Sequence, residues 1–103
     1  MAFIKLATTD DIKTGKMERF DAGQTRILIC NVEGEFFAVD DNCTHEDASL
    51  YLGALHGDVV KCSLHGGKFN VRTGEPVEEP ACVGLRTYAI ELRDGDIYVD
   101  IDG

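Results

Sequence analysis

Two similar pairs of cysteine and histidine constrain the fold of this chain more than any other feature of its sequence. The first pair is Cys43-Thr44-His45 and the second is Cys62-Ser63-Leu64-His65, with sixteen residues between them. Each pair follows a short apolar segment and begins a stretch with the composition of a loop. Two such pairs can bind one metal centre only if their loops face each other. If the two pairs share one metal centre, the chain must fold so that these two loops meet.

The pairs lie in the part of the chain with the weakest strand pattern. Residues 40–86 are rich in Gly, Asp, Asn, Ser, Pro and Thr, and the strands expected there, 59–61 and 68–71, are short. A loop-rich stretch of this length inside a small domain is uncommon unless it is functional or braced. A metal held by the two pairs would brace it.

The segments on either side carry clear strand patterns. We expect strands at 3–7, 17–21, 24–32, 35–39, 87–92 and 96–101, and one helical turn within 9–15. Glu33-Gly34 and Asp94-Gly95 are typical two-residue hairpin turns. The sequence therefore predicts an all-β fold in which residues 1–103 form a single domain. Its terminal hairpins would form a base that carries a smaller metal-binding subdomain at roughly 40–81.

The charge balance excludes several classes of function. The chain has 10 Lys and Arg against 19 Asp and Glu, a formal net charge of −9, which disfavours nucleic acid and anionic lipid as partners. The longest apolar run, 27–30, is too short to cross a bilayer, and no signal-peptide pattern opens the chain. We expect a cytoplasmic monomer. Its acidic surface could serve solubility alone or could dock a basic partner.

The other metal-binding residue types have simpler interpretations. Cys30 lies in an apolar run and is expected to be a small buried side chain, Cys82 is expected to be a loop or core thiol, and His56 a turn residue. For the two pairs, a mononuclear zinc site is the main rival interpretation. Zinc modules usually group like ligands, whereas here each loop supplies one Cys and one His. A two-iron cluster, with thiolates on one iron and imidazoles on the other, explains this mixture.

At these residues the sequence resembles the Rieske family of [2Fe–2S] proteins, whose signature is C-x-H followed about sixteen residues later by C-x-x-H. The resemblance extends over nearly the whole chain and implies an antiparallel β-sandwich with a small inserted cluster-binding subdomain. It implies one [2Fe–2S] cluster, with Cys43 and Cys62 on the inner iron and His45 and His65 on the outer iron. It also suggests that a loop at Pro80 shields the cluster.

Four positions depart from the high-potential branch of that family. Ala48 and Leu64 stand where that branch has two disulfide-bonded cysteines, and Gly67 and Phe69 stand where it has a serine and a tyrosine. Without those two hydroxyl donors, the resemblance implies a reduction potential at the low end of the Rieske range of about −150 to +300 mV.

The branch without those features includes the small soluble ferredoxins of bacterial oxygenases. The resemblance implies a one-electron carrier, with no catalytic activity of its own, between an NAD(P)H-dependent flavoprotein reductase and a terminal oxygenase that hydroxylates aromatic rings. We expect no oxygenase domain in this chain. Glu46, Asp47 and Leu64 are candidate docking residues. Two alternatives stay open: the small Rieske-like subunit of an NAD(P)H nitrite reductase, and a structural zinc module.

Overall fold

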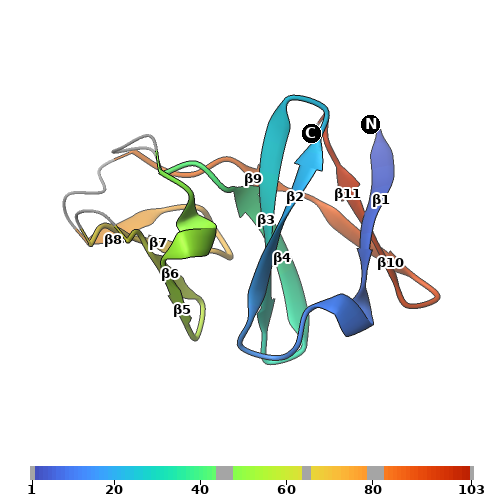
Figure 1. Ribbon diagram of the computed structural model, residues 1–103, viewed down its shortest axis with the longest axis horizontal. Helices are drawn as coiled ribbons and strands as arrows, with labels where there is room; N and C mark the ends of the chain where they lie inside the picture. The colour runs from blue at the N-terminus through green and yellow to red at the C-terminus, as the bar shows by residue number, and fades with distance from the viewer. Residues whose placement is uncertain (1, 44–47, 64–65, 79–82, 103) are drawn as a thin grey trace.

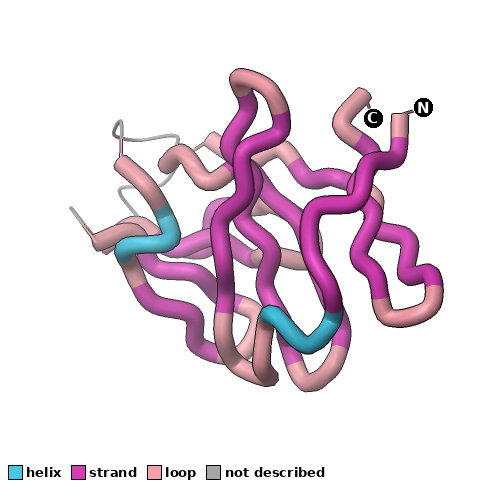
Figure 2. The backbone as a smooth tube through the Cα atoms, turned by 45° about the vertical axis from the view of Figure 1, so that its right-hand side comes forward, coloured by secondary structure: helices cyan, strands magenta, loops and turns pink. Residues whose placement is uncertain are grey.

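The chain forms short antiparallel strands in three sheets, as the computed structural model in Figure 1 shows. The structure describes residues 2–43, 48–63, 66–78 and 83–102. Two 3-10 turns, η1 (Thr9–Asp11) and η2 (Leu50–Leu52), are the cyan segments of Figure 2. The strands are β1 (Phe3–Thr8), β2 (Met17–Ala22), β3 (Thr25–Val32), β4 (Glu35–Asp40), β5 (Ala54–His56), β6 (Val59–Lys61), β7 (Lys68–Asn70), β8 (Pro76–Glu78), β9 (Thr87–Tyr88), β10 (Ile90–Arg93) and β11 (Asp96–Asp100).

The three sheets differ in which part of the chain supplies them. The terminal sheet has the order β1-β11-β10, and the central sheet has the order β2-β3-β4-β9. The insert sheet, β5-β6-β7-β8, comes from the stretch between β4 and β9 and lies to the left in Figure 1. This arrangement confirms the predicted all-β fold with antiparallel pairing. Within the described residues, no helix is long and apolar enough to span a membrane.

The central sheet separates two apolar cores, and β3 contributes to both. Ile27 and Ile29 lie in the core shared with the terminal sheet, whereas Leu28 and Cys30 lie in the core shared with the insert sheet. Successive side chains of a strand point to opposite faces, so a strand buried on both faces has no polar positions. This is why 27–30 is an uninterrupted apolar run.

Both predicted hairpin turns are confirmed. Glu33 and Gly34 have positive φ angles of 52° and 92°, and Asp94 and Gly95 have φ angles of 51° and 83°. Two consecutive residues with positive φ make a turn whose twist matches that of the flanking strands. These turns fix the register of β3 against β4 and of β10 against β11.

The expected strand at 87–92 is wrong in one respect, because two sheets share it. β9 pairs with β4 in the central sheet, while β10 pairs with β11 in the terminal sheet. The chain changes sheet at Ala89, whose carbonyl accepts the N–H of Asp100 at 3.0 Å. Apolar alternation continues through this corner, so the sequence pattern does not reveal it.

Candidate metal centre

Cys43 and Cys62 occupy equivalent positions at the start of two loops. Cys43 lies three residues beyond the end of β4, and Cys62 directly follows β6. The N–H of Cys43 donates to the carbonyl of Ala48 at 2.8 Å, and the N–H of Cys62 donates to the carbonyl of Gly67, also at 2.8 Å. Each loop is thus closed by a hydrogen bond that spans five residues.

The two cysteines lie in the same apolar core. Each is 2% exposed, and both belong to the core between the central and insert sheets, together with Leu50, Val60 and Phe69. The structure therefore brings together the two predicted cysteine ligands. The two predicted histidine ligands, His45 and His65, lie outside the described residues. Within the described part, no group of three metal-binding side chains forms.

Gly53, which directly precedes β5, allows a close approach to Lys61, the last residue of β6. A Cβ atom on Gly53 would lie 1.9 Å from the carbonyl oxygen of Lys61, the residue before Cys62. Gly53 has a negative φ of −89°, and the crowding at the Lys61 carbonyl is the observation that requires glycine here. At Gly66, inside the second loop, the φ of 76° instead favours glycine.

The first loop is closed by a short ladder that extends beyond Cys43. Asn42 and Ser49 form an isolated antiparallel bridge, and the N–H of Leu50 donates to the carbonyl of Asp41 at 2.6 Å. The carboxylate of Asp41 accepts the N–H of Tyr51 at 3.0 Å. Sequence reasoning missed both Asp41 and Gly53, because a polar residue and a glycine in a loop-rich stretch carry no pattern of their own.

The segment that contains Pro80 runs from Gly74 to Leu85, and these two residues pack tightly against each other. The N–H of Leu85 donates to the carbonyl of Gly74, and the N–H of Gly74 donates to the carbonyl of Asn70, both at 2.7 Å. Gly74 has a φ of 79°, and a Cβ atom there would lie 2.3 Å from the carbonyl oxygen of Leu85. Pro80 itself lies outside the described residues, so its shielding role stays a prediction.

The remaining cysteines and histidine were expected to lie outside the metal centre. Cys30 is fully buried, and burial, followed by the charge of Asp41, raises the pKa of its thiol to about 12. It therefore stays protonated at neutral pH, which confirms the expected small buried side chain. Cys82 lies outside the described residues. His56 is the last residue of β5, exposed and beside the turn that leads to β6, rather than within that turn.

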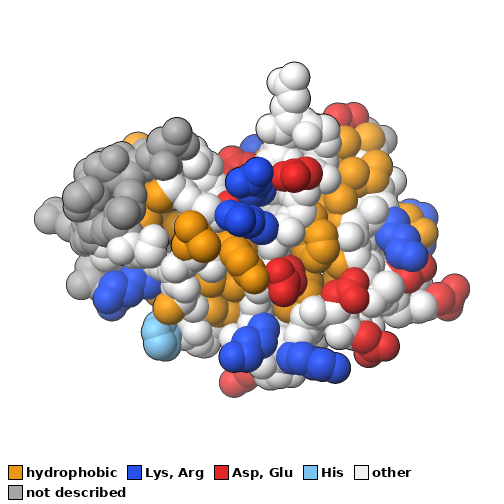
Figure 3. Space-filling view, in the orientation of Figure 1, with side chains coloured by type: hydrophobic (Ala, Val, Ile, Leu, Met, Phe, Trp, Pro, Cys, Tyr) orange, Lys and Arg blue, Asp and Glu red, His pale blue; other side chains and the backbone are white. Residues whose placement is uncertain are grey.

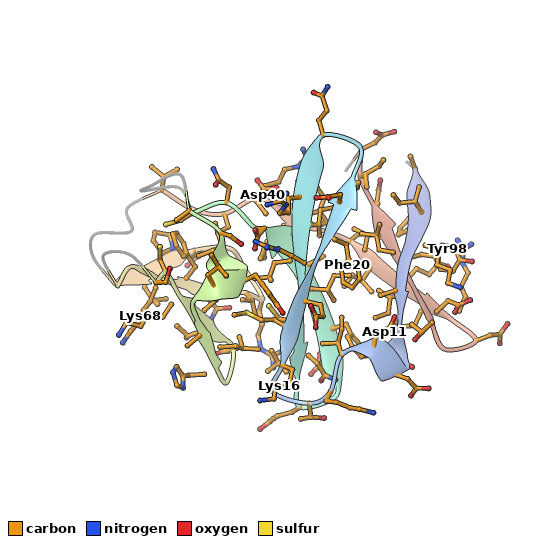
Figure 4. The ribbon with its side chains drawn as sticks, viewed as in Figure 1. Asp11, Lys16, Phe20, Asp40, Lys68 and Tyr98 are labelled. Carbon is orange, nitrogen blue, oxygen red and sulfur yellow. The ribbon has the colours of Figure 1, made fainter. Side chains whose placement is uncertain are left out.

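The two residues that flank the second loop in the sequence are basic. Lys61 and Lys68 are cross-strand partners at the ends of β6 and β7, directly before and after that loop, and Figure 4 labels Lys68 on the insert sheet. Over the rest of the face in Figure 3, basic and acidic side chains are interspersed. Two predicted acidic docking residues, Glu46 and Asp47, lie outside the described residues, as does Leu64. The acidic docking face therefore stays a prediction.

These features fit a thiolate-bound metal centre. Two buried thiols, each at the start of a loop, are costly to ionise unless a cation compensates their negative charge. Matching loop closures and the close approach at Gly53 hold both cysteines in one apolar core. The fold and the site together are those of a small β protein whose two buried cysteines, each at the start of a loop, fit a metal centre.

Comparison with known proteins identifies the family. The model for the Rieske [2Fe-2S] domain matches residues 2–89. The chain is 48% identical over its full length to the ferredoxin component of biphenyl 2,3-dioxygenase from Rhodococcus jostii, covering 96% of that protein. It is 44% identical to the biphenyl dioxygenase ferredoxin subunit of a Pseudomonas species, with 97% of this chain and 93% of that protein covered.

A solved structure supports the same assignment. In the complex of reduced oxygenase and oxidized ferredoxin of carbazole 1,9a-dioxygenase, one chain superposes with a TM-score of 0.91 at 38% identity, over 94% of this chain and 91% of that chain. The chain described here belongs to the Rieske [2Fe–2S] family, and its cofactor is one Rieske-type [2Fe–2S] cluster. The alternative of a structural zinc module is therefore excluded.

Proposed function

We propose that this chain is the ferredoxin component of a bacterial aromatic-ring-hydroxylating dioxygenase system. The observation that carries this proposal is similarity along the whole chain to two ferredoxins of biphenyl dioxygenases. When bound, the cluster takes up and releases one electron at a time. The protein residues hold the cluster and exclude water from its sulfur ligands, and they catalyse no reaction on an organic substrate.

Cys43, Cys62, His45 and His65 are the proposed ligands. Support for the cysteines comes from their burial and from the matched closure of their loops. Support for the histidines comes from the sequence spacing, which places each of them inside one of these loops. A buried position for both cysteines agrees with thiolates on an inner iron, which leaves the imidazoles for an outer iron.

The ligand assignment can be tested with cysteine variants and a matched control. Cys43→Ala and Cys62→Ala should lose the visible absorbance and the low-average-g EPR signal of the reduced cluster, with iron content falling in parallel. Cys30→Ala removes a thiol from the same apolar core and should keep all three. A Cys43→Ala protein with the full iron content and an unchanged EPR spectrum would refute the assignment.

The proposed partners are an NAD(P)H-dependent flavoprotein reductase and a terminal oxygenase, all in the cytoplasm. Support for the oxygenase is the solved complex in which a similar ferredoxin is paired with its oxygenase. Support for the reductase is indirect, because the electrons of a ferredoxin component must come from a donor. The two ferredoxins of biphenyl dioxygenases are 48% and 44% identical to this chain, whereas a solved structure assigned to the small subunit of an NADPH nitrite reductase is only 18% identical, which favours the ferredoxin role.

Component replacement tests this function. The reductase and oxygenase of the Rhodococcus jostii biphenyl dioxygenase would be assayed for NADH-dependent oxygenation of biphenyl, with this chain replacing the native ferredoxin. We expect product formation that depends on the added chain and is absent with Cys43→Ala. If the oxidised chain accepts no electrons from the reductase, and its chemically reduced form delivers none to the oxygenase, the proposed function is wrong.

A further inference from the structure

Asp41 is a buried carboxylate at the neck of the first cysteine loop. Asp41 is 1% exposed, whereas its neighbour Asp40, the last residue of β4 and labelled in Figure 4, is only half-buried. Burial of a carboxylate is costly unless hydrogen bonds or opposite charges compensate it. The contacts of Asp41 should therefore show why an acid is placed there.

Two groups from the far side of the loop bind this carboxylate. The hydroxyl of Ser49 donates to one carboxylate oxygen at 2.5 Å, and the N–H of Tyr51 donates to the other at 3.0 Å. Ser49 is also the bridge partner of Asn42, directly before Cys43. The carboxylate thus binds the same short ladder that closes the loop, so a change at Asp41 acts on the position of Cys43.

Asp41 is linked to a positively charged side chain through the hydroxyl group of Ser49. The guanidinium of Arg19, on β2 of the central sheet, donates to the Ser49 oxygen at 2.8 Å. It also lies 5.1 Å above the ring of Tyr51. The Ser49 oxygen accepts a hydrogen bond from Arg19, and the Ser49 hydroxyl donates one to Asp41. The three side chains thus form a hydrogen-bonded relay from the central sheet to the neck of the first loop.

The charge of Asp41 acts inside the core that contains the cysteines. After burial, that charge is the second cause of the raised pKa of Cys30, a member of the same core as Cys43 and Cys62. Electrostatic interactions act more strongly in a poorly solvated interior than in water. A negative charge there opposes the arrival of an additional electron.

We propose that Asp41 is a positioning residue that also sets the reduction potential, with Arg19 opposing it through Ser49. Asp41 holds the neck of the first loop closed, and its negative charge disfavours the reduced state of the cluster. Arg19 offsets part of that charge. This inference rests on the proposed binding of the cluster by Cys43.

Opposite shifts in potential test the electrostatic part. The reduction potential of the holoprotein would be measured by redox titration, with dithionite as the one-electron reductant. Asp41→Asn keeps the side-chain shape and removes the negative charge, so the potential should rise. Arg19→Gln removes the positive charge, so the potential should fall by less, because Arg19 is exposed. The matched control is Asp21→Asn, which removes one negative charge at a side chain that is 71% exposed and should shift the potential little.

Hydrogen exchange tests the positioning part without measuring electron transfer. Exchange of the backbone amides in 49–52 should accelerate in Asp41→Asn and stay unchanged in Asp21→Asn. Unchanged protection in Asp41→Asn would overturn the positioning role. Shifts of the same sign in Asp41→Asn and Arg19→Gln, or no shift in either, would overturn the electrostatic role.

The inference stays testable if Asp41→Asn fails to hold a cluster. Arg19 lies on the surface of β2 and outside the loop, and Arg19→Gln alone must then lower the potential. An unchanged potential in that variant would refute the relay. Failure of the proposed function has a different signature, because a chain that exchanges no electrons with the dioxygenase components can still show both potential shifts.

Discussion

Replacing Gly53 by alanine should damage the metal centre from outside both cysteine loops. The new Cβ atom would lie 1.9 Å from the carbonyl oxygen of Lys61 and 3.2 Å from that of Leu50. Ordinary contacts between a carbon and a carbonyl oxygen begin at about 3.3 Å, so residue 53 and the Lys61 carbonyl must separate by about 1.4 Å to reach that distance. Because Lys61 directly precedes Cys62, the displacement reaches the second of the two proposed cysteine ligands. Overpacking of this kind costs about 1–3 kcal/mol.

The assay should separate damage at the centre from loss of stability. Iron content, the half-life of the visible absorbance on warming and the EPR spectrum would be measured for Gly53→Ala beside Gly57→Ala. Gly57 has a φ of 61° with no atom within 4 Å of its added Cβ. Alanine there adds backbone strain of roughly 1–2 kcal/mol and no clash near Lys61. We expect a shortened half-life and an altered spectrum for Gly53→Ala, and a normal spectrum for Gly57→Ala. Wild-type values for Gly53→Ala would refute the steric argument.

Three further predictions concern potential, pH and salt. Gly67→Ser combined with Phe69→Tyr should raise the reduction potential, because the new hydroxyls can donate to the cluster, and voltammetry showing no rise would contradict this. The pKa of Cys30 rises on folding from 9.0 to about 12, so the free energy of unfolding should be highest below pH 9 and fall as the pH rises toward 12. Chemical denaturation between pH 9 and 10 should show a shallower fall for Cys30→Ala, and equal slopes would argue against this pKa shift. If acidic side chains guide docking, the rate of reduction by the reductase should fall as salt increases, and a rate independent of salt would remove the steering hypothesis.

The parts of the fold that could be predicted depend on local chemistry. Glu33-Gly34 and Asp94-Gly95 mark hairpins because both residues of each turn adopt positive φ, which few residue types tolerate. Cys43 and Cys62 could be proposed as ligands because a Cys–His pair occurs twice in the sequence. Neither inference required knowledge of a distant contact.

The parts that escaped prediction depend on distant contacts. β5 and β8 are as short as β6 but lack its two adjacent β-branched residues, so neither stands out from a loop in the sequence. Asp40 and Asp41 are adjacent and identical in type, yet one forms a hydrogen bond with Tyr88 and the other is buried against Ser49. Only the arrangement of the sheets decides which acid enters the core.

Because β3 lies between the two cores, a substitution at one of its residues can alter one core and leave the other unchanged. A change at Leu28 or Cys30 acts on the core that contains Cys43 and Cys62, and a change at Ile27 or Ile29 acts on the opposite core. Selection can therefore adjust the electron-carrying half and the supporting half through substitutions one residue apart. Ile27 and Leu28 are equal in size and both fully buried, so the same substitution at the two positions disturbs one core or the other.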